Sequence, residues 1–150
     1  MKRLFELRDY NFELQKDIAN LIGIGRRSYT DIENGFVNLS YDKLSKIAYH
    51  YNVSTDYILE LTDRTKVHTT TGNCDLSRLT ILRKTKKVAQ IDVALAIGMN
   101  QNSYSKYETG KSKPPLKKLI LLSDYYDVSV DYLLNRTDIK KKYPKKKWER

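Results

Sequence analysis

The chain has 150 residues, 40% of them hydrophobic, and a formal net charge of +10 at pH 7. No stretch approaches the ~18 consecutive apolar residues of a membrane span, and the first residues lack the apolar block of a signal peptide. A single cysteine, Cys74, excludes an internal disulfide. We therefore expect a cytoplasmic protein without a membrane partner.

The positive charge is concentrated in the second half. Residues 1–75 carry 10 Lys and Arg against 11 Asp and Glu, whereas residues 76–150 carry 18 against 7. Clustered basic charge favours a polyanionic partner, nucleic acid before an anionic membrane surface. About half of the excess lies in residues 140–148, so we expect residues 139–150 to form a solvated basic tail whose charge follows a phosphate backbone and whose Trp148 stacks.

One pattern of 60 residues occurs twice without a gap, at residues 4–63 and again at 79–138, each position matching the one 75 residues later. Of the 60 aligned pairs, 22 are identical. Such a duplication predicts two copies of one small folding unit. The expected organisation is a first domain at residues 1–63, a linker at 64–75, a second domain at 76–138 and the tail at 139–150.

Within each copy the apolar spacing is helical. Leu44, Ile47, Ala48 and Tyr51 lie at i, i+3, i+4 and i+7, which places them on one helix face. Glycines at 23, 35, 98 and 110 are placed to end helices in the left-handed conformation, and Ser54 and Ser129 are good caps for a short fifth helix. The fold class is therefore all-α, with about five short helices per copy.

Two helices joined by a tight glycine-containing turn are expected at residues 15–33 and 90–108, the layout of a helix-turn-helix. The second copy closely resembles the Cro/repressor-like (XRE) helix-turn-helix family through Gln90-Ile91-Asp92-Val93-Ala94, Ile97-Gly98-Met99-Asn100, Ser103-Tyr104-Ser105-Lys106-Tyr107-Glu108-Thr109-Gly110-Lys111, Pro114 and Val128-Ser129-Val130-Asp131-Tyr132-Leu133-Leu134. The first copy resembles it through Leu7-Arg8, Gln15, Ile18-Ala19, Gly23, Ser28, Glu33, Gly35 and Val53-Ser54-Thr55-Asp56-Tyr57. The resemblance covers about 120 residues and implies a five-helix fold that binds double-stranded DNA.

In that fold the N-terminal end of the third helix enters the major groove. The resemblance thus assigns DNA contacts to Arg26, Arg27, Ser28 and Thr30 in the first copy and to Gln101, Asn102, Ser103 and Lys106 in the second. Gln15 and Gln90 match the family's phosphate-contacting glutamine, and Lys111 and Lys113 are further phosphate candidates. Arginine fits guanine and the Gln and Asn amides fit adenine, so we predict an asymmetric site with a guanine-containing and an adenine-containing half.

The two copies are unequal. Lys106 replaces Asp31, and Lys111-Ser112-Lys113-Pro114 replaces Phe36-Val37-Asn38-Leu39, so the second copy is expected to bind DNA more strongly. The second copy also has Asn100, a good helix cap, in place of Gly25. The apolar Phe36, Val37 and Leu39 are interpreted equally as a self-association patch or as residues packed back on the fourth helix.

The linker, which includes Thr69-Thr70-Thr71-Gly72-Asn73, averages roughly 20 Å end to end and stretches to about 40 Å. Successive major-groove faces lie about 34–36 Å apart. One chain would then place both copies on neighbouring half-sites. Alternatively, two chains associate as a homodimer and each uses mainly its second copy. The sequence leaves both open.

Other residue types are expected in structural roles. Tyr29, Tyr104 and Tyr107 are interpreted as core or core-edge residues. Glu33 and Glu108 are expected to form helix-stabilising hydrogen bonds, because a carboxylate does not suit a phosphate. Neither histidine has a catalytic context, and no Cys/His cluster has metal spacing. We therefore expect no enzyme activity, cofactor or metal.

The sequence predicts a sequence-specific transcriptional regulator, favoured as a repressor and associated with the nucleoid when bound. The alternative is an antitoxin-like or regulator-binding adaptor in which only the second copy binds DNA. A third hypothesis is non-specific compaction of nucleic acid through the basic tail.

Overall fold

The structure is a computed structural model that describes residues 1–35, 39–66 and 73–146. Its elements in these ranges are ten α-helices, and none of these helices is long and apolar enough to cross a membrane. The chain divides into two compact units. The first contains Met1–Val67 together with Tyr143–Arg150, and the second contains His68–Lys142. The domain boundaries expected from the repeat remain a prediction.

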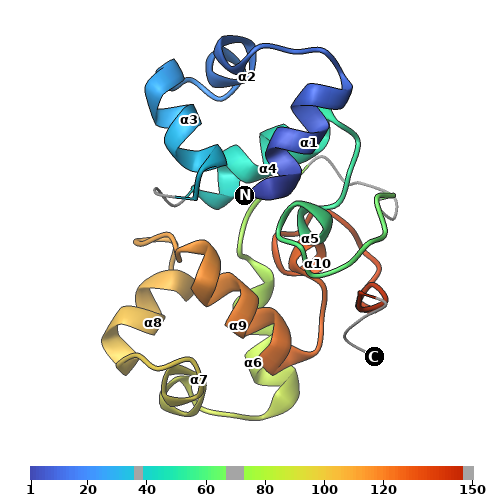
Figure 1. Ribbon diagram of the computed structural model, residues 1–150. Helices are drawn as coiled ribbons and strands as arrows, with labels where there is room; N and C mark the ends of the chain where they lie inside the picture. Colours follow the sequence, from blue (N-terminus) through green and yellow to red (C-terminus); the bar gives the residue numbers. More distant parts are fainter. Residues whose placement is uncertain (36–38, 67–72, 147–150) are drawn as a thin grey trace. The chain divides into compact units, whose positions relative to one another are not determined.

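In its described residues the first unit contains five helices, labelled in Figure 1: α1 (Lys2–Tyr10), α2 (Gln15–Leu21), α3 (Arg26–Glu33), α4 (Tyr41–His50) and α5 (Thr55–Ile58). Its core is made of one apolar face from each helix. Leu4, Ile18, Tyr29, Leu44 and Ile58 are all fully buried. Of the helical spacing read from the sequence, Leu44, Ile47 and Ala48 are 0% exposed on α4, which confirms the core-facing pattern, while Tyr51 follows the helix and is half-buried.

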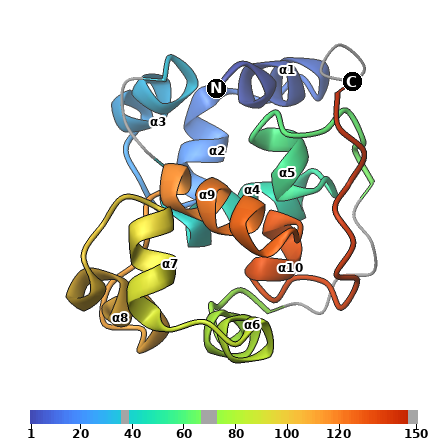
Figure 2. The same ribbon diagram turned by 90° about the horizontal axis from the view of Figure 1, so that it is seen from below.

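The second unit repeats this order with α6 (Arg78–Lys86), α7 (Gln90–Ala96), α8 (Gln101–Glu108), α9 (Leu116–Tyr126) and α10 (Val130–Leu133). Leu79, Val93, Tyr104, Leu119 and Leu133 are fully buried at the equivalent places. Helix α7 packs against α8 as α2 packs against α3, and Figure 2 shows the α7–α8 pair in yellow. The all-α fold with two five-helix copies is confirmed.

The turn between the two crossing helices depends on glycine. Gly23 follows α2 with φ +71°, and Gly98 follows α7 with φ +72°. In this left-handed region a side chain is strained, so glycine is favoured. Ala19 and Ala94 are buried at the crossing, where a small side chain lets the helices approach. These features confirm the predicted helix-turn-helix geometry in both units.

The predicted serine caps are present. The Ser54 hydroxyl accepts a hydrogen bond from the Tyr57 amide at 2.9 Å, and the Ser129 hydroxyl accepts one from the Tyr132 amide at 3.0 Å. Each bond satisfies an amide at the start of a four-residue helix that would otherwise lack a partner. The short fifth helix of each unit is therefore fixed locally by its cap.

An arginine at the start of each unit ties the first helix to the chain after the fifth. Arg3 donates to the Tyr57 carbonyl at 2.7 Å, to the Thr62 carbonyl and to Asp63 at 2.7 Å. Arg78 repeats this with the Tyr132 carbonyl at 3.0 Å, the Thr137 carbonyl and Asp138 at 2.7 Å. Each unit is thus closed end to end by one guanidinium.

The expectation of a solvated tail is wrong for Tyr143 and Lys146, whereas Pro144 and Lys145 between them are exposed. Tyr143 and Lys146 are buried, the Thr62 hydroxyl donates to the Pro144 carbonyl at 2.6 Å, and Lys146 lies 3.8 Å from Glu60. Figure 2 shows this segment in red beside the green chain that follows α5. The ring of Tyr143, which follows three lysines, supplies the apolar surface for burial that a purely charged segment lacks.

Some sequence expectations lie outside the described residues. These are Phe36 and Val37 of the proposed self-association patch, Trp148, and residues 67–72 of the expected linker. Leu39, the remaining patch residue, is 2% exposed, so it belongs to the core of the first unit. The burial of Leu39 agrees with the packing interpretation and removes this residue from an exposed patch.

Candidate nucleic-acid interface

The leading end of α3 presents an exposed row of polar side chains. Arg26, Arg27 and Ser28 form the first turn of the helix and are exposed, while Thr30 is half-buried. Gly25 precedes them in extended backbone and provides no side-chain cap. The positions assigned to a major groove are therefore helical and accessible.

The leading end of α8 has the same geometry with different chemistry. Gln101, Asn102 and Lys106 are exposed and Ser103 is half-buried. The Asn100 side chain accepts a hydrogen bond from the Ser103 amide at 2.8 Å, which confirms the predicted cap. Lys111 and Lys113 are exposed in the segment that follows α8.

We predict that Asn100→Ala lowers the free energy of unfolding of the second unit by about 1 kcal/mol, because the Ser103 amide loses its partner. Chemical denaturation measures this change. The matched control is Asn102→Ala in the same turn, where an exposed side chain is expected to matter by less than about 0.5 kcal/mol. Equal effects of the two variants would contradict a capping role.

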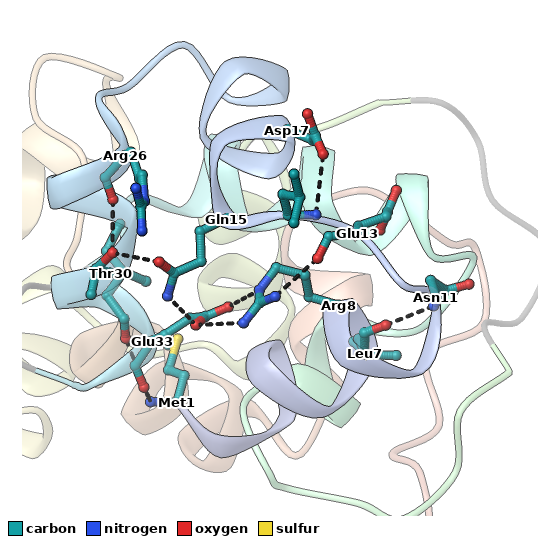
Figure 3. Close-up of polar contacts among 12 residues, drawn as sticks. Met1, Leu7, Arg8, Asn11, Glu13, Gln15, Asp17, Arg26, Thr30 and Glu33 are labelled. Carbon is teal, nitrogen blue, oxygen red and sulfur yellow. Dashed lines mark hydrogen bonds and ion pairs between the residues drawn. The ribbon is translucent and has the colours of Figure 1, made fainter.

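A polar network lies behind the exposed end of α3, shown in Figure 3. The Gln15 amide Nε2 donates to Glu33 Oε2 at 3.0 Å, and the Thr30 hydroxyl lies 2.9 Å from Gln15 Oε1 and 3.0 Å from the Arg26 carbonyl. Arg8 donates to both carboxylate oxygens of Glu33, at 2.7 and 3.3 Å. The network therefore fixes the Gln15 side chain at the start of α2 beside the first turn of α3.

The second unit contains the equivalent network. Gln90 Nε2 donates to Glu108 Oε2 at 3.0 Å, and Arg83 donates to the two oxygens of Glu108 at 2.6 and 3.3 Å. Here Thr80 from α6 adds a bond to Glu108 Oε2 at 3.3 Å. Both glutamines assigned to phosphate contact are thus oriented by a carboxylate, and each primary amide retains a second N–H donor.

Glu33 and Glu108 are ionised anchors. Burial raises the pKa of each carboxyl, but hydrogen bonds from the arginine and the glutamine, with the arginine charge, outweigh it, so each pKa lies below its ordinary value of 4.5. Their side chains are each 4% exposed in the ion pair. The hydrogen-bonding role predicted for these glutamates is confirmed, but the bonds join α3 and α8 to the two preceding helices of their units and do not lie within one helix.

The arginine partners were not identified from the sequence. Arg8 and Glu33 are 25 positions apart, as are Arg83 and Glu108, and all four are identical between the copies. These pairs could have been predicted from the sequence, because opposite charges recur at the same separation in both copies. The predicted core role of the tyrosines is confirmed, since Tyr29 and Tyr104 are fully buried and Tyr107 is 8% exposed.

Two tandem helix-turn-helix units, each with an exposed leading helix end, are the architecture of a helix-turn-helix protein. A helix-turn-helix domain family profile matches residues 2–64, and a second helix-turn-helix profile matches residues 79–133. No solved structure matches the chain significantly.

The curated relatives are named as transcriptional regulators or as a transcriptional repressor. The uncharacterized HTH-type transcriptional regulator YobD of Bacillus subtilis is 49% identical over 61 residues, 41% of this chain and 54% of that protein. The HTH-type transcriptional regulator ImmR of Bacillus subtilis is 30% identical over 123 residues, 82% of this chain and 92% of ImmR. The cryptic phage CTXphi transcriptional repressor RstR of Vibrio cholerae is 36% identical over 59 residues, 39% of this chain and 53% of RstR.

The chain belongs to the XRE-type helix-turn-helix family of DNA-binding transcriptional regulators and contains two copies of the domain. It spans about half the length of several of its curated relatives, such as 54% of YobD and 45% of YqaE.

Proposed function

We propose that the protein is a sequence-specific repressor that inserts the leading ends of α3 and α8 into the major groove of a DNA operator. The observation that carries this proposal is the exposure of Arg26, Arg27, Gln101 and Asn102 on the first turns of these helices. A helix end of this kind reaches base edges with its first residues. Occupation of a promoter then represses by steric exclusion, and RstR is itself named as a repressor.

The two helix ends read different bases in this proposal. The guanidinium groups of Arg26 and Arg27 match guanine O6 and N7, whereas the amides of Gln101 and Asn102 match adenine N7 and N6. Gln15 and Gln90, held by their glutamates, contribute the remaining amide N–H to phosphates, and Ser28, Ser103, Thr30, Lys106, Lys111 and Lys113 complete the contacts. The operator is then asymmetric although the protein is internally duplicated.

Selection of binding sites from a random DNA pool tests this proposal. We expect a guanine-containing and an adenine-containing half-site, and a loss of about 1–3 kcal/mol in binding free energy for each bidentate contact removed. Arg26→Ala/Arg27→Ala is expected to weaken the preference for guanine in its half-site. Gln101→Ala/Asn102→Ala is expected to weaken the preference for adenine in the other half-site. Lys140→Ala, at an exposed position after the second repeat, is the control and is expected to leave base preference unchanged.

The outcomes separate the candidate functions. If only Gln101→Ala/Asn102→Ala weakens binding, the first unit serves assembly and the adaptor function is favoured. Asp31, half-buried on α3 where the second unit has the exposed Lys106, is the observation that favours this alternative, because an aspartate opposes phosphate. If neither pair matters, or if the selected site is a perfect palindrome, the proposed reading of DNA is wrong.

A further inference from the structure

Each repeat has an exposed corner formed by the outer face of its first helix and the turn that follows. In the first unit this acidic corner consists of Glu6, Asp9, Tyr10 and Phe12. Glu6, Asp9 and Tyr10 share one helix face at i, i+3 and i+4. Tyr10 is 83% exposed and Phe12 is 95% exposed. Two large aromatic side chains in water, rimmed by carboxylates, are typical of a surface that another protein covers.

The corresponding basic corner of the second unit consists of Ile81, Lys84, Thr85 and Lys87. These are the residues 75 positions after Glu6, Asp9, Tyr10 and Phe12. Ile81 is 61% exposed, and both lysines are exposed. The same place in the fold thus has an aromatic acidic surface in one repeat and an aliphatic basic surface in the other.

Folding of the repeat does not require the aromatic residues. Phe12 has φ +55° and Lys87 has φ +59°, so the two turns have the same left-handed conformation with different side chains. Bulky residues are rare in this conformation. Lys87 shows that the turn forms without an aromatic ring, and the exposure of Phe12 shows that its ring packs little against the first unit.

Charge decides which surfaces can meet. Two acidic corners would oppose Glu6 and Asp9 with the same carboxylates, and two basic corners would oppose Lys84 and Lys87 with the same ammonium groups. Pairing an acidic corner with a basic corner brings opposite charges together and covers Tyr10 and Phe12 with Ile81. Lys2, which lies 3.5 Å from Glu6 at the surface, reduces the negative charge without reversing it.

We propose that the acidic corner of one chain docks on the basic corner of a second copy. The contact is head-to-tail, because the two surfaces differ, so each chain keeps one free surface of each kind and assembly continues with concentration. This self-association goes beyond DNA recognition and is expected without DNA.

Sedimentation equilibrium of the full chain without DNA tests the proposal. The wild type is expected to associate beyond a dimer as its concentration rises and to dissociate as salt is added. Asp9→Lys/Tyr10→Thr/Phe12→Lys places the second repeat's own residues in the first repeat, and we expect it to weaken association at least about tenfold, or 1.4 kcal/mol. Ile81→Glu/Lys84→Asp is expected to do the same.

Mixing the two variants identifies the pairing. Each alone lacks one of the complementary corners, but the mixture contains the native acidic corner on one chain and the native basic corner on the other, so association is expected to return. The matched control is Tyr49→Asp, which also introduces the second repeat's residue at a 73% exposed tyrosine and is expected to have no effect. A monomeric wild type, unchanged association of either variant, or no recovery on mixing would overturn the proposal.

Discussion

Glu108→Ala is expected to lower the free energy of unfolding of the second unit by roughly 3–5 kcal/mol. The substitution leaves the Arg83 guanidinium, whose side chain is 16% exposed, without its carboxylate partner, and removes the acceptor of Gln90. A buried charge without its partner costs more than an exposed pair gains. Chemical denaturation measures the loss of unfolding free energy. Hydrogen exchange of peptides from α6–α10 shows whether the loss lies in the second unit.

The control for Glu108→Ala is Glu6→Ala. Glu6 forms a pair with Lys2 at the surface, with side-chain exposures of 46% and 79%, and such pairs contribute about 0–1 kcal/mol. A loss from Glu108→Ala no larger than that from Glu6→Ala would contradict an anchoring role. A loss spread evenly over both units would show instead that they unfold together.

The same ion pair predicts a pH signature. The pKa of Glu108 is lower in the folded protein than its ordinary value of 4.5, so the folded state binds this proton more weakly than the unfolded chain does. The stabilisation is therefore present above about pH 4.5 and is lost as the pH falls through the folded pKa. Glu108→Gln is expected to make unfolding free energy less dependent on pH below 4.5.

The sequence predicted the fold because its determinants are local. Apolar residues at helical spacing, Gly23 and Gly98 at the turns, and the caps Ser54 and Ser129 each act within a few residues of their own position. The internal duplication added a second, independent instance of every signal. These local signals, present in both copies, were sufficient to predict the order of the ten short helices found in the described part of the chain.

The sequence predicted the candidate contact residues but not the ion pairs that lie behind them. The helix ends bearing Arg26 and Gln101 followed from the motif, whereas the Arg8–Glu33 pair behind them joins residues 25 positions apart. The spacing of residues within one helix does not indicate which charged residue from another helix forms an ion pair with it. The burial of Tyr143 was missed for a related reason. The high lysine content of the segment predicted exposure for all its residues, although one aromatic ring packs against a part of the chain that is distant in sequence.

Removal of Tyr143–Arg150 is expected to destabilise the first unit by about 3 kcal/mol. Burial of the Tyr143 ring contributes about 2 kcal/mol, and the hydrogen bond from Thr62 to the Pro144 carbonyl, at 2.6 Å, adds about 1 kcal/mol. Hydrogen exchange of peptides from α1–α5 and from α6–α10 measures the two units separately. The loss is expected in α1–α5, although the deleted residues follow the second repeat in the chain.

Tyr143→Ala separates this packing from the positive charge of the segment, because it keeps every lysine. Its cost is expected to approach that of the truncation and not to exceed it, since a terminal segment that has lost its anchor detaches and the remaining contacts are lost with it. Lys145→Ala, at an exposed position between the two buried residues, is the control and is expected to change stability by less than about 0.5 kcal/mol. If truncation and Tyr143→Ala both leave α1–α5 unchanged, the segment does not stabilise the first unit, and its contribution is limited to its charge.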